Sequence, residues 1–139
     1  MTHSLWALLA YAAWTLVLAL AVVTWRGWLI RHARFRINDF PSGAKHGPDV
    51  YWRLNRAHAN ALENLPIFAA IVLTAKVAGL APAYFGCLAV VVPCARVAQS
   101  TFHVAGNTAA TVTLRFFGFF TQWLAMAAMT VLLACAACR

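Results

Sequence analysis

The sequence predicts an all-α membrane protein, a bundle of four transmembrane helices in a single domain that covers residues 1–139. Hydrophobic residues make up 63% of the chain and charged residues only 10%, against about 25% charged in a typical soluble domain. The apolar residues gather in four runs, each near the roughly 20 residues that a helix needs to cross a bilayer. These runs cover Leu5–Trp25, about Asn55–Leu80, about Pro82–Val104 and about Val112–Ala137.

The first span carries no charged residue and lacks the basic start and short apolar core of a signal peptide, so we expect an uncleaved helix. Trp25–Phe35 can continue this helix into the membrane interface. Asn38–Pro48 contains two prolines and two glycines and is predicted to be a loop. Pro48 and Asp49 then open the second helix, where a carboxylate is favourable near the positive end of the helix dipole.

The second and third spans each contain a proline, and the third and fourth contain the cysteines. Pro66 and Pro93 predict kinks, because proline removes a backbone donor and crowds the preceding turn. Cys135 and Cys138 form a CxxC pair, but no His or second pair stands nearby at metal-site spacing. Helix packing therefore fits this pair better than redox or metal chemistry, and we predict no metal site.

The formal charge of +8 is concentrated in the connection between the first two spans. By the positive-inside rule this distribution predicts that the 26–55 loop is cytoplasmic and that both termini lie on the other side of the membrane. The same residues can attract anionic lipid head groups. The basic excess is thus a topology signal, and it argues against nucleic acid as a partner.

Four polar side chains share one face at the start of the second span. Arg53, Arg56, Asn60 and Glu63 fall within a stripe roughly 80° wide at about 100° per residue. Charged residues on a membrane helix cost a few kcal/mol each, by insertion scales, and usually face a protein interior or a watery cavity. This stripe predicts such a cavity near the inner leaflet.

The third and fourth spans add polar residues at a similar depth. Arg96, Gln99, Ser100 and His103 share one face of the third span, and Arg115 begins the fourth. Four arginines therefore face a single nearby carboxylate, that of Glu63. This surplus predicts an anionic ligand with more than one acid group, which the planar fork of arginine suits.

Structural roles for these residues remain open as alternatives. Arg53 lies nearest the loop and is also suited to anchoring a lipid head group. An Arg–Glu pair with Asn60 tying two helices together would explain the others without a ligand. His58 lies on the other side of its helix and is interpreted as a packing or subunit-contact residue. The chain has no HExxH, Walker, GxSxG or dinucleotide-binding motif.

The second span resembles the signature of the MAPEG superfamily, the membrane-associated proteins in eicosanoid and glutathione metabolism. The superfamily pattern is R-x-H-x-N-x-x-E-x-x-x-P/F, and residues 56–68 read RAHANALENLPIF. Four spans in about this length, a basic first loop and the Arg-Val-Ala run at 96–98 extend the resemblance. Pro48-Asp49 is also similar to the microsomal prostaglandin E synthase branch.

The resemblance implies a homotrimer that binds glutathione between subunits on the cytoplasmic side. The matching positions are Arg56, Asn60, Glu63 and Arg96, with Arg115 as the candidate catalytic residue. Arginines would hold the two carboxylates, and Glu63 would meet the ammonium group or orient an arginine. A nearby cation would lower the pKa of the glutathione thiol by favouring the thiolate. Further candidate contacts on the same faces are Arg53, Gln99 and His103.

The implied activity is attack of the glutathione thiolate on a lipophilic electrophile or peroxide that arrives from the bilayer. Departures from the prostaglandin synthase pattern favour a general glutathione transferase or peroxidase. Gln99 and His103 stand where that branch has His and Tyr, and Phe116 stands where it has a hydroxyl residue. Two alternatives remain: a non-catalytic lipid- or glutathione-binding member of the superfamily, and a small transporter subunit. The absence of an acidic residue in the first span argues against the transporter.

Overall fold

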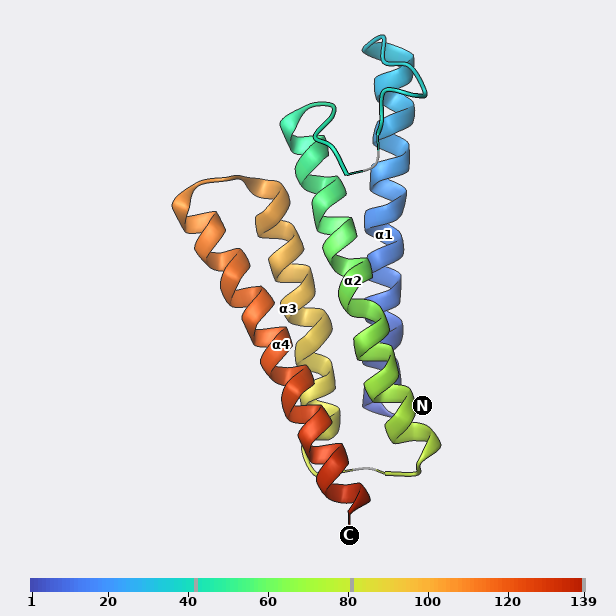
Figure 1. The fold of residues 1–139 in the computed structure, drawn as a ribbon, viewed down its shortest axis with the longest axis vertical. Coiled ribbons are helices and arrows are strands. Elements are labelled where there is room, and N and C mark those ends of the chain that lie inside the picture. The colour runs from blue at the N-terminus through green and yellow to red at the C-terminus, as the bar shows by residue number, and fades with distance from the viewer. Residues whose placement is uncertain (42, 81, 139) are drawn as a thin grey trace.

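The computed structural model describes residues 1–41, 43–80 and 82–138, which form four long helices packed side by side (Figure 1). The helices are α1 (His3–His32), α2 (Asp49–Val77), α3 (Phe85–Ala105) and α4 (Ala109–Ala137). Each is long and apolar enough to cross a membrane. The predicted four-span, all-α fold is therefore confirmed. Ser42 and Ala81 in the predicted connections, and the terminal Arg139, lie outside the described residues.

Both chain ends lie at one end of the bundle, and the α1–α2 loop and the α3–α4 connection lie at the other (Figure 1). Four spans in alternating directions return the chain to the side where it began. α1, α2 and α3 pack against one another, whereas α4 packs mainly on α3 and touches α2 over a smaller area. The side of α2 that faces α4 is therefore less covered than the side that faces α1.

α1 continues beyond its apolar stretch, as predicted for Trp25–Phe35, but it ends at His32, before Phe35. Its buried residues form a stripe that includes Ala7, Tyr11, Leu18 and Val22, separated by four or seven positions. This stripe meets α2 and α3, and most of the remaining surface of α1 points outward. α2 begins at Asp49 directly after the extended Pro48, which confirms the predicted start of the second helix.

An aromatic cluster holds the α1–α2 loop against the ends of these two helices. Tyr51 is fully buried, and its hydroxyl accepts a hydrogen bond from Nε of Arg26. The guanidinium carbon of Arg26 also lies 5.3 Å from the centroid of the Phe40 ring. The His46 ring packs against Phe40 and, with a centroid separation of 5.3 Å, against Trp52. These contacts fix the position of Lys45 beside the first turn of α2.

α3 and α4 approach closely at a glycine. A Cβ atom added to Gly118 would lie 2.8 Å from Cβ of Gln99 and 3.2 Å from the carbonyl oxygen of Ala95. A small residue at a helix interface allows this approach, as is usual in membrane bundles. α4 starts at Ala109, where the side chain of Thr108 accepts a hydrogen bond from the backbone N–H of Thr111 at 3.3 Å.

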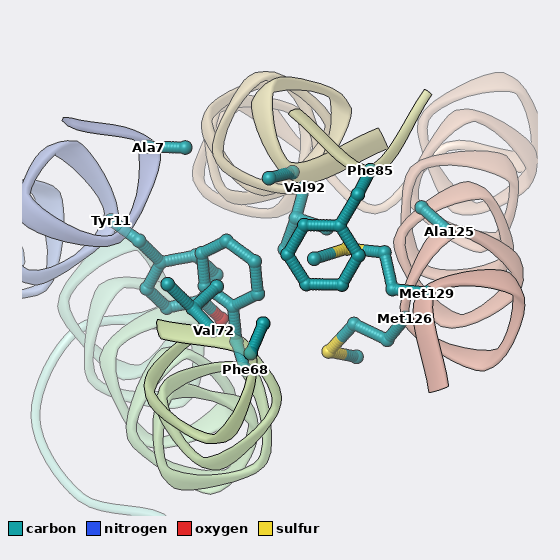
Figure 2. Packing of buried hydrophobic residues seen from close by; sticks show 11 residues of the cluster. Ala7, Tyr11, Phe68, Val72, Phe85, Val92, Ala125, Met126 and Met129 are labelled. Atoms are coloured by element: carbon teal, nitrogen blue, oxygen red, sulfur yellow. The ribbon is translucent and has the colours of Figure 1, made fainter. Parts of the chain in front are cut away.

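The apolar core at the end near the termini draws residues from all four helices (Figure 2). Tyr11 of α1 and Phe68 of α2 pack with ring centroids 5.7 Å apart. In Figure 2, Phe85 of α3 and Met129 of α4 point toward the same space between the helices. Close van der Waals packing of this kind is what holds helices together in lipid, where apolar burial supplies little driving force.

Several boundaries and local features differ from the expected ones. α3 begins at Phe85 rather than near Pro82, because Tyr84 adopts a left-handed φ of 63° that does not continue a helix. Pro66 and Pro93 lie inside α2 and α3, as predicted, and the kinks expected at these prolines stay a prediction. All four cysteines are free thiols exposed on the subunit surface, so Cys135 and Cys138 do not pack inside the subunit.

Candidate functional site

A polar pocket of about 290 Å³ lies at the end of the bundle that carries the α1–α2 loop. α2 contributes four of its side chains, and the loop, α3, α4 and the α3–α4 connection contribute the rest. The lining residues are Lys45, Asp49, Trp52, Arg53, Arg56, His103, Asn107 and Arg115. Four of these side chains carry a positive charge and one carries a negative charge, so the pocket is strongly cationic.

The α2 wall of the pocket follows directly from helical spacing. Asp49, Trp52, Arg53 and Arg56 stand at positions i, i+3, i+4 and i+7, which lie on one face of a helix. Nε of Arg53 donates a hydrogen bond of 3.1 Å to the carbonyl oxygen of Val104. This carbonyl belongs to the last turn of α3, where it has no partner within the helix. Arg53 thus ties α2 to α3, which a lipid-head anchor would not do.

His103 and Arg115 form the opposite wall. The half-buried His103 lies within electrostatic reach of Arg53, Arg56, Arg96 and Arg115. The predicted convergence of α2, α3 and α4 at one depth is therefore seen for four of the candidate residues: Arg53, Arg56, His103 and Arg115.

Arg96 lies inside the bundle and does not line the pocket. Its side chain is 0% exposed, and Nη1 donates a hydrogen bond of 2.5 Å to Oε1 of Gln99. Its guanidinium carbon lies 5.6 Å from the centroid of the Tyr11 ring. Its Nε and Nη2 atoms have no hydrogen-bond partner among the described residues. Arg96 and Gln99 therefore form a buried polar pair next to the pocket instead of part of its wall.

Asn60 and Glu63 continue the same α2 face below the pocket. Glu63 is exposed, and Arg96 lies within electrostatic reach of its carboxylate. The ion pair formed within the described part of the chain is Lys45–Asp49, so the Arg–Glu pair considered as a structural alternative is not formed there. Further along this face, Ile67 and Ile71 line an apolar pocket of about 180 Å³ together with Trp123 and Met126 of α4.

Sequence reasoning missed several polar residues of this region. Asp49 and Trp52 share the helical face of Arg53 and Arg56, so helical spacing alone was enough to find them. Lys45 and Asn107 come from connections, where no periodicity marks their direction. Gln122 is fully buried on α4, and neither atom of its side-chain amide has a partner in the described ranges. Gln122 lies one helical turn from Gly118, on the face of α4 that meets α3, and this spacing could have predicted its burial.

A comparison with protein-family models assigns the chain to a family. A protein-family model described as the MAPEG family matches residues 4–135, nearly the whole chain. The chain belongs to the MAPEG family. A comparison with curated proteins found no match. MAPEG membership and the four candidate spans together make this an integral multi-pass membrane protein. The MAPEG family includes glutathione transferases and also members without catalytic activity.

Proposed function

We propose that this protein is a glutathione-dependent membrane transferase or peroxidase that acts on lipophilic electrophiles. The observation that carries the proposal is the cationic pocket, which Lys45, Arg53, Arg56 and Arg115 line together with a single carboxylate, that of Asp49. Glutathione carries two carboxylates, one ammonium group and a thiol, and so matches this balance of charge. Family membership supports the same ligand, because MAPEG proteins commonly use glutathione.

The arginines divide into binding and activating roles. Arg53 and Arg56 bind the glutathione carboxylates, where charge-assisted hydrogen bonds are about twice as strong as neutral ones. Arg115, on the opposite wall beside His103, stabilises the thiolate. Arg96 and Gln99 act from inside the bundle by adding positive potential and holding α3 in place. Asn60 and Glu63 bind the part of glutathione that extends below the pocket.

The lipophilic substrate approaches along the α2–α4 side. The α2 face that carries Arg53 and Arg56 leads past Glu63 to the apolar pocket at Ile67 and Ile71. In a transfer, the thiolate sulfur forms a bond to the electrophilic carbon as the leaving group departs with its electron pair. In a peroxidase cycle, two glutathione molecules are oxidised to the disulfide while the peroxide is reduced to an alcohol and water.

The active assembly is proposed to be a homotrimer with the pocket end facing the cytoplasm. Arg56 and Glu63 are exposed on a single subunit, and their charges are costly at membrane depth unless another surface covers them. A neighbouring subunit supplies that cover, and the MAPEG resemblance supplies the number three. Anionic and zwitterionic lipids surround the remaining apolar surface.

A thiolate absorbance titration tests the proposed activity. Purified protein is titrated with glutathione at neutral pH while the ultraviolet absorbance of the thiolate is followed. We expect saturable formation of thiolate, because the cationic pocket favours the charged form of the thiol. Glutathione bound only as the neutral thiol, with no turnover of electrophilic or peroxide substrates, would contradict a catalytic function.

That outcome would favour a second candidate, a non-catalytic lipid- or glutathione-binding protein. The observation behind this alternative is Phe116, an exposed phenylalanine that follows Arg115 and has no hydroxyl to donate to a thiolate. Such a protein would keep the cationic pocket and the ligand but would lack the group that activates the thiol.

A further inference from the structure

An apolar groove runs along the outside of the bundle between α1 and α3. Its volume is about 660 Å³, within the roughly 300–1,000 Å³ of typical ligand pockets. α1 lines it from His3 to Ala10 and α3 from Val90 to Ala98, and each helix contributes residues at positions i, i+3, i+4 and i+7. The groove begins at the end of the bundle that carries the chain termini (Figure 1), and none of its described lining residues belongs to the cationic pocket.

A smaller pocket adjoins the groove where α1 and α3 begin. This terminal pocket measures about 160 Å³, and its walls include the polar side chains of Thr2, Ser4 and Lys76. His3 lines both the terminal pocket and the groove, so the two are continuous. A Cβ atom added to Gly86 would lie 3.5 Å from Cβ of His3, which places His3 against the first turn of α3. The combined site has polar groups at one end and an apolar groove at the other.

Lys76 gives the terminal pocket a positive charge that lies far from the acidic side chains of the chain. These are only three, Asp39, Asp49 and Glu63. Asp39 in the α1–α2 loop and Asp49 at the start of α2 lie at the opposite end of the bundle (Figure 1). Glu63 precedes Lys76 by 13 positions on α2, roughly 20 Å along the helix axis. A counter-charge for Lys76 must therefore come from outside the subunit.

A second copy of the chain is a poor source of that counter-charge. Copies in a symmetric membrane assembly lie at the same depth, so the acidic side chains of a neighbour are as far from the terminal pocket as those of the subunit itself. A membrane lipid with a negatively charged head group carries its charge at the membrane surface, where the long side chain of Lys76 can reach it. The charge of the site thus favours an anionic lipid over another subunit as its occupant.

The first turns of α1 and α3 add positive potential at the same place. Their N-cap residues, Thr2 and Tyr84, make no side-chain capping hydrogen bond within the described part of the chain. The first backbone N–H groups of a helix have no partner inside it, and the helix dipole favours an anion beside them. Phe85 and Gly86, the first two residues of α3, line the terminal pocket. These helix ends support the preference for an anion that Lys76 confers.

The length of the groove matches one leaflet of a bilayer. The stretch of α3 from Val90 to Ala98 spans about 12 Å along the helix axis, and the hydrocarbon layer of one leaflet is about 15 Å thick. Trp6 lines the groove near its start and is 57% exposed, as is common for tryptophan at a membrane interface. An acyl chain that enters at head-group level can therefore lie along the groove, parallel to both helices.

We propose that each subunit binds one anionic phospholipid, with its head group at Lys76 in the terminal pocket and one acyl chain in the groove between α1 and α3. This site goes beyond the proposed function and does not depend on glutathione binding. Lys76 selects the lipid by charge and the groove holds it by shape, whereas lipids elsewhere on the apolar surface need no particular head group.

Native mass spectrometry with two lipids that share their acyl chains tests this site. The protein in mild detergent is mixed with equal amounts of palmitoyl-oleoyl phosphatidylglycerol, which is anionic, and palmitoyl-oleoyl phosphatidylcholine, which is zwitterionic. The variants are Lys76→Gln, which removes the charge, and Ala10→Phe, which fills the groove. Their matched controls are Lys45→Gln, at the only other lysine of the chain, and Ala13→Phe, at an exposed alanine of α1 outside the groove lining.

We expect the wild type to retain phosphatidylglycerol in preference to phosphatidylcholine. Lys76→Gln should reduce this preference about fivefold, the effect of one basic residue close to an anionic lipid, and Lys45→Gln should leave it unchanged. Ala10→Phe should lower the retention of both lipids, because the ring occupies the space of the acyl chain, whereas Ala13→Phe should not. Equal effects of the two lysine variants, or unchanged retention in Ala10→Phe, would overturn the proposal.

Two further readouts keep the test decisive. Lys76 and Ala10 are exposed, so neither substitution should disturb folding, and unchanged thermal unfolding of each variant checks this. Phosphatidylglycerol with a photoactivatable group in its acyl chain should form adducts with the wild type within residues 3–10 and 90–98. Adducts confined to α2 and α4 would overturn the proposal. A loss of oligomers in Ala10→Phe with the lipid preference intact would show that another subunit fills the groove, and would overturn it as well.

Discussion

Arg115 has a different place in the pocket from the arginines of α2. It extends from α4 and lines the pocket together with Arg53, Arg56 and the half-buried His103. If it stabilises the thiolate, its charge acts on the reacting atom more than on the bound tripeptide. Arg115→Ala should therefore lower kcat by a larger factor than it raises the dissociation constant of glutathione. Steady-state kinetics and equilibrium binding measure the two effects, and equal losses in both would contradict this role.

We expect Arg96 to lower the stability of the subunit while it supports glutathione binding. Its guanidinium is fully buried, and two of its nitrogens lack partners in the described part of the chain. Replacement by an apolar side chain of similar length removes this desolvation cost and is often neutral or stabilising. Arg96→Met should keep or raise the thermal unfolding midpoint while weakening glutathione binding by roughly three- to tenfold. A lowered midpoint with unchanged binding would instead assign Arg96 a purely structural role.

At the scale of elements, the close contact between α3 and α4 depends on Gly118. A methyl group there would meet Cβ of Gln99 at 2.8 Å and the backbone of Ala95 at 3.2 Å, so one helix must shift. Gly118→Ala should lower the free energy of unfolding by about 1–3 kcal/mol, the usual cost of overpacking. Gly27→Ala on α1 is the matched control, because nothing lies within 4 Å of its added methyl group. Unfolding in detergent compares the two variants, and equal stability would refute the close contact.

The helices and their polar faces could be predicted from the sequence, whereas the partners of those faces could not. Apolar runs and the Pro48-Asp49 pair located the spans, and helical spacing placed Arg53 and Arg56 on one face. The same spacing placed Arg96 with the ligand, but the buried Arg96 side chain lies against Tyr11 of α1, whereas His103 on the same face lines the pocket. Helical spacing defines a face and gives no information about which neighbour covers it. Lys45 lines the pocket because aromatic contacts hold its loop there. A loop has no helical spacing from which the direction of its side chains could be predicted.

For the whole molecule, the exposed charges at membrane depth call for a neighbouring subunit. Arg56 and Glu63 are exposed on the single chain, and the neighbour that covers them would also close the side of the pocket. We predict a stable homotrimer in mild detergent, to be measured by native mass spectrometry. Spectra containing only monomers or dimers would contradict the assembly and would leave the cost of these charges unexplained.

Equilibrium binding of glutathione to the Arg56→Ala variant tests whether the cationic pocket binds glutathione. The matched control is Arg31→Ala, which removes an exposed arginine from the last turn of α1, outside the pocket lining. Loss of one charge-assisted contact costs about 1.5–3 kcal/mol, so the dissociation constant should rise roughly 10- to 150-fold in Arg56→Ala and stay unchanged in Arg31→Ala. Calorimetric titration of intact trimers measures both. Binding by Arg56→Ala as tight as that of the wild type would contradict the assigned site.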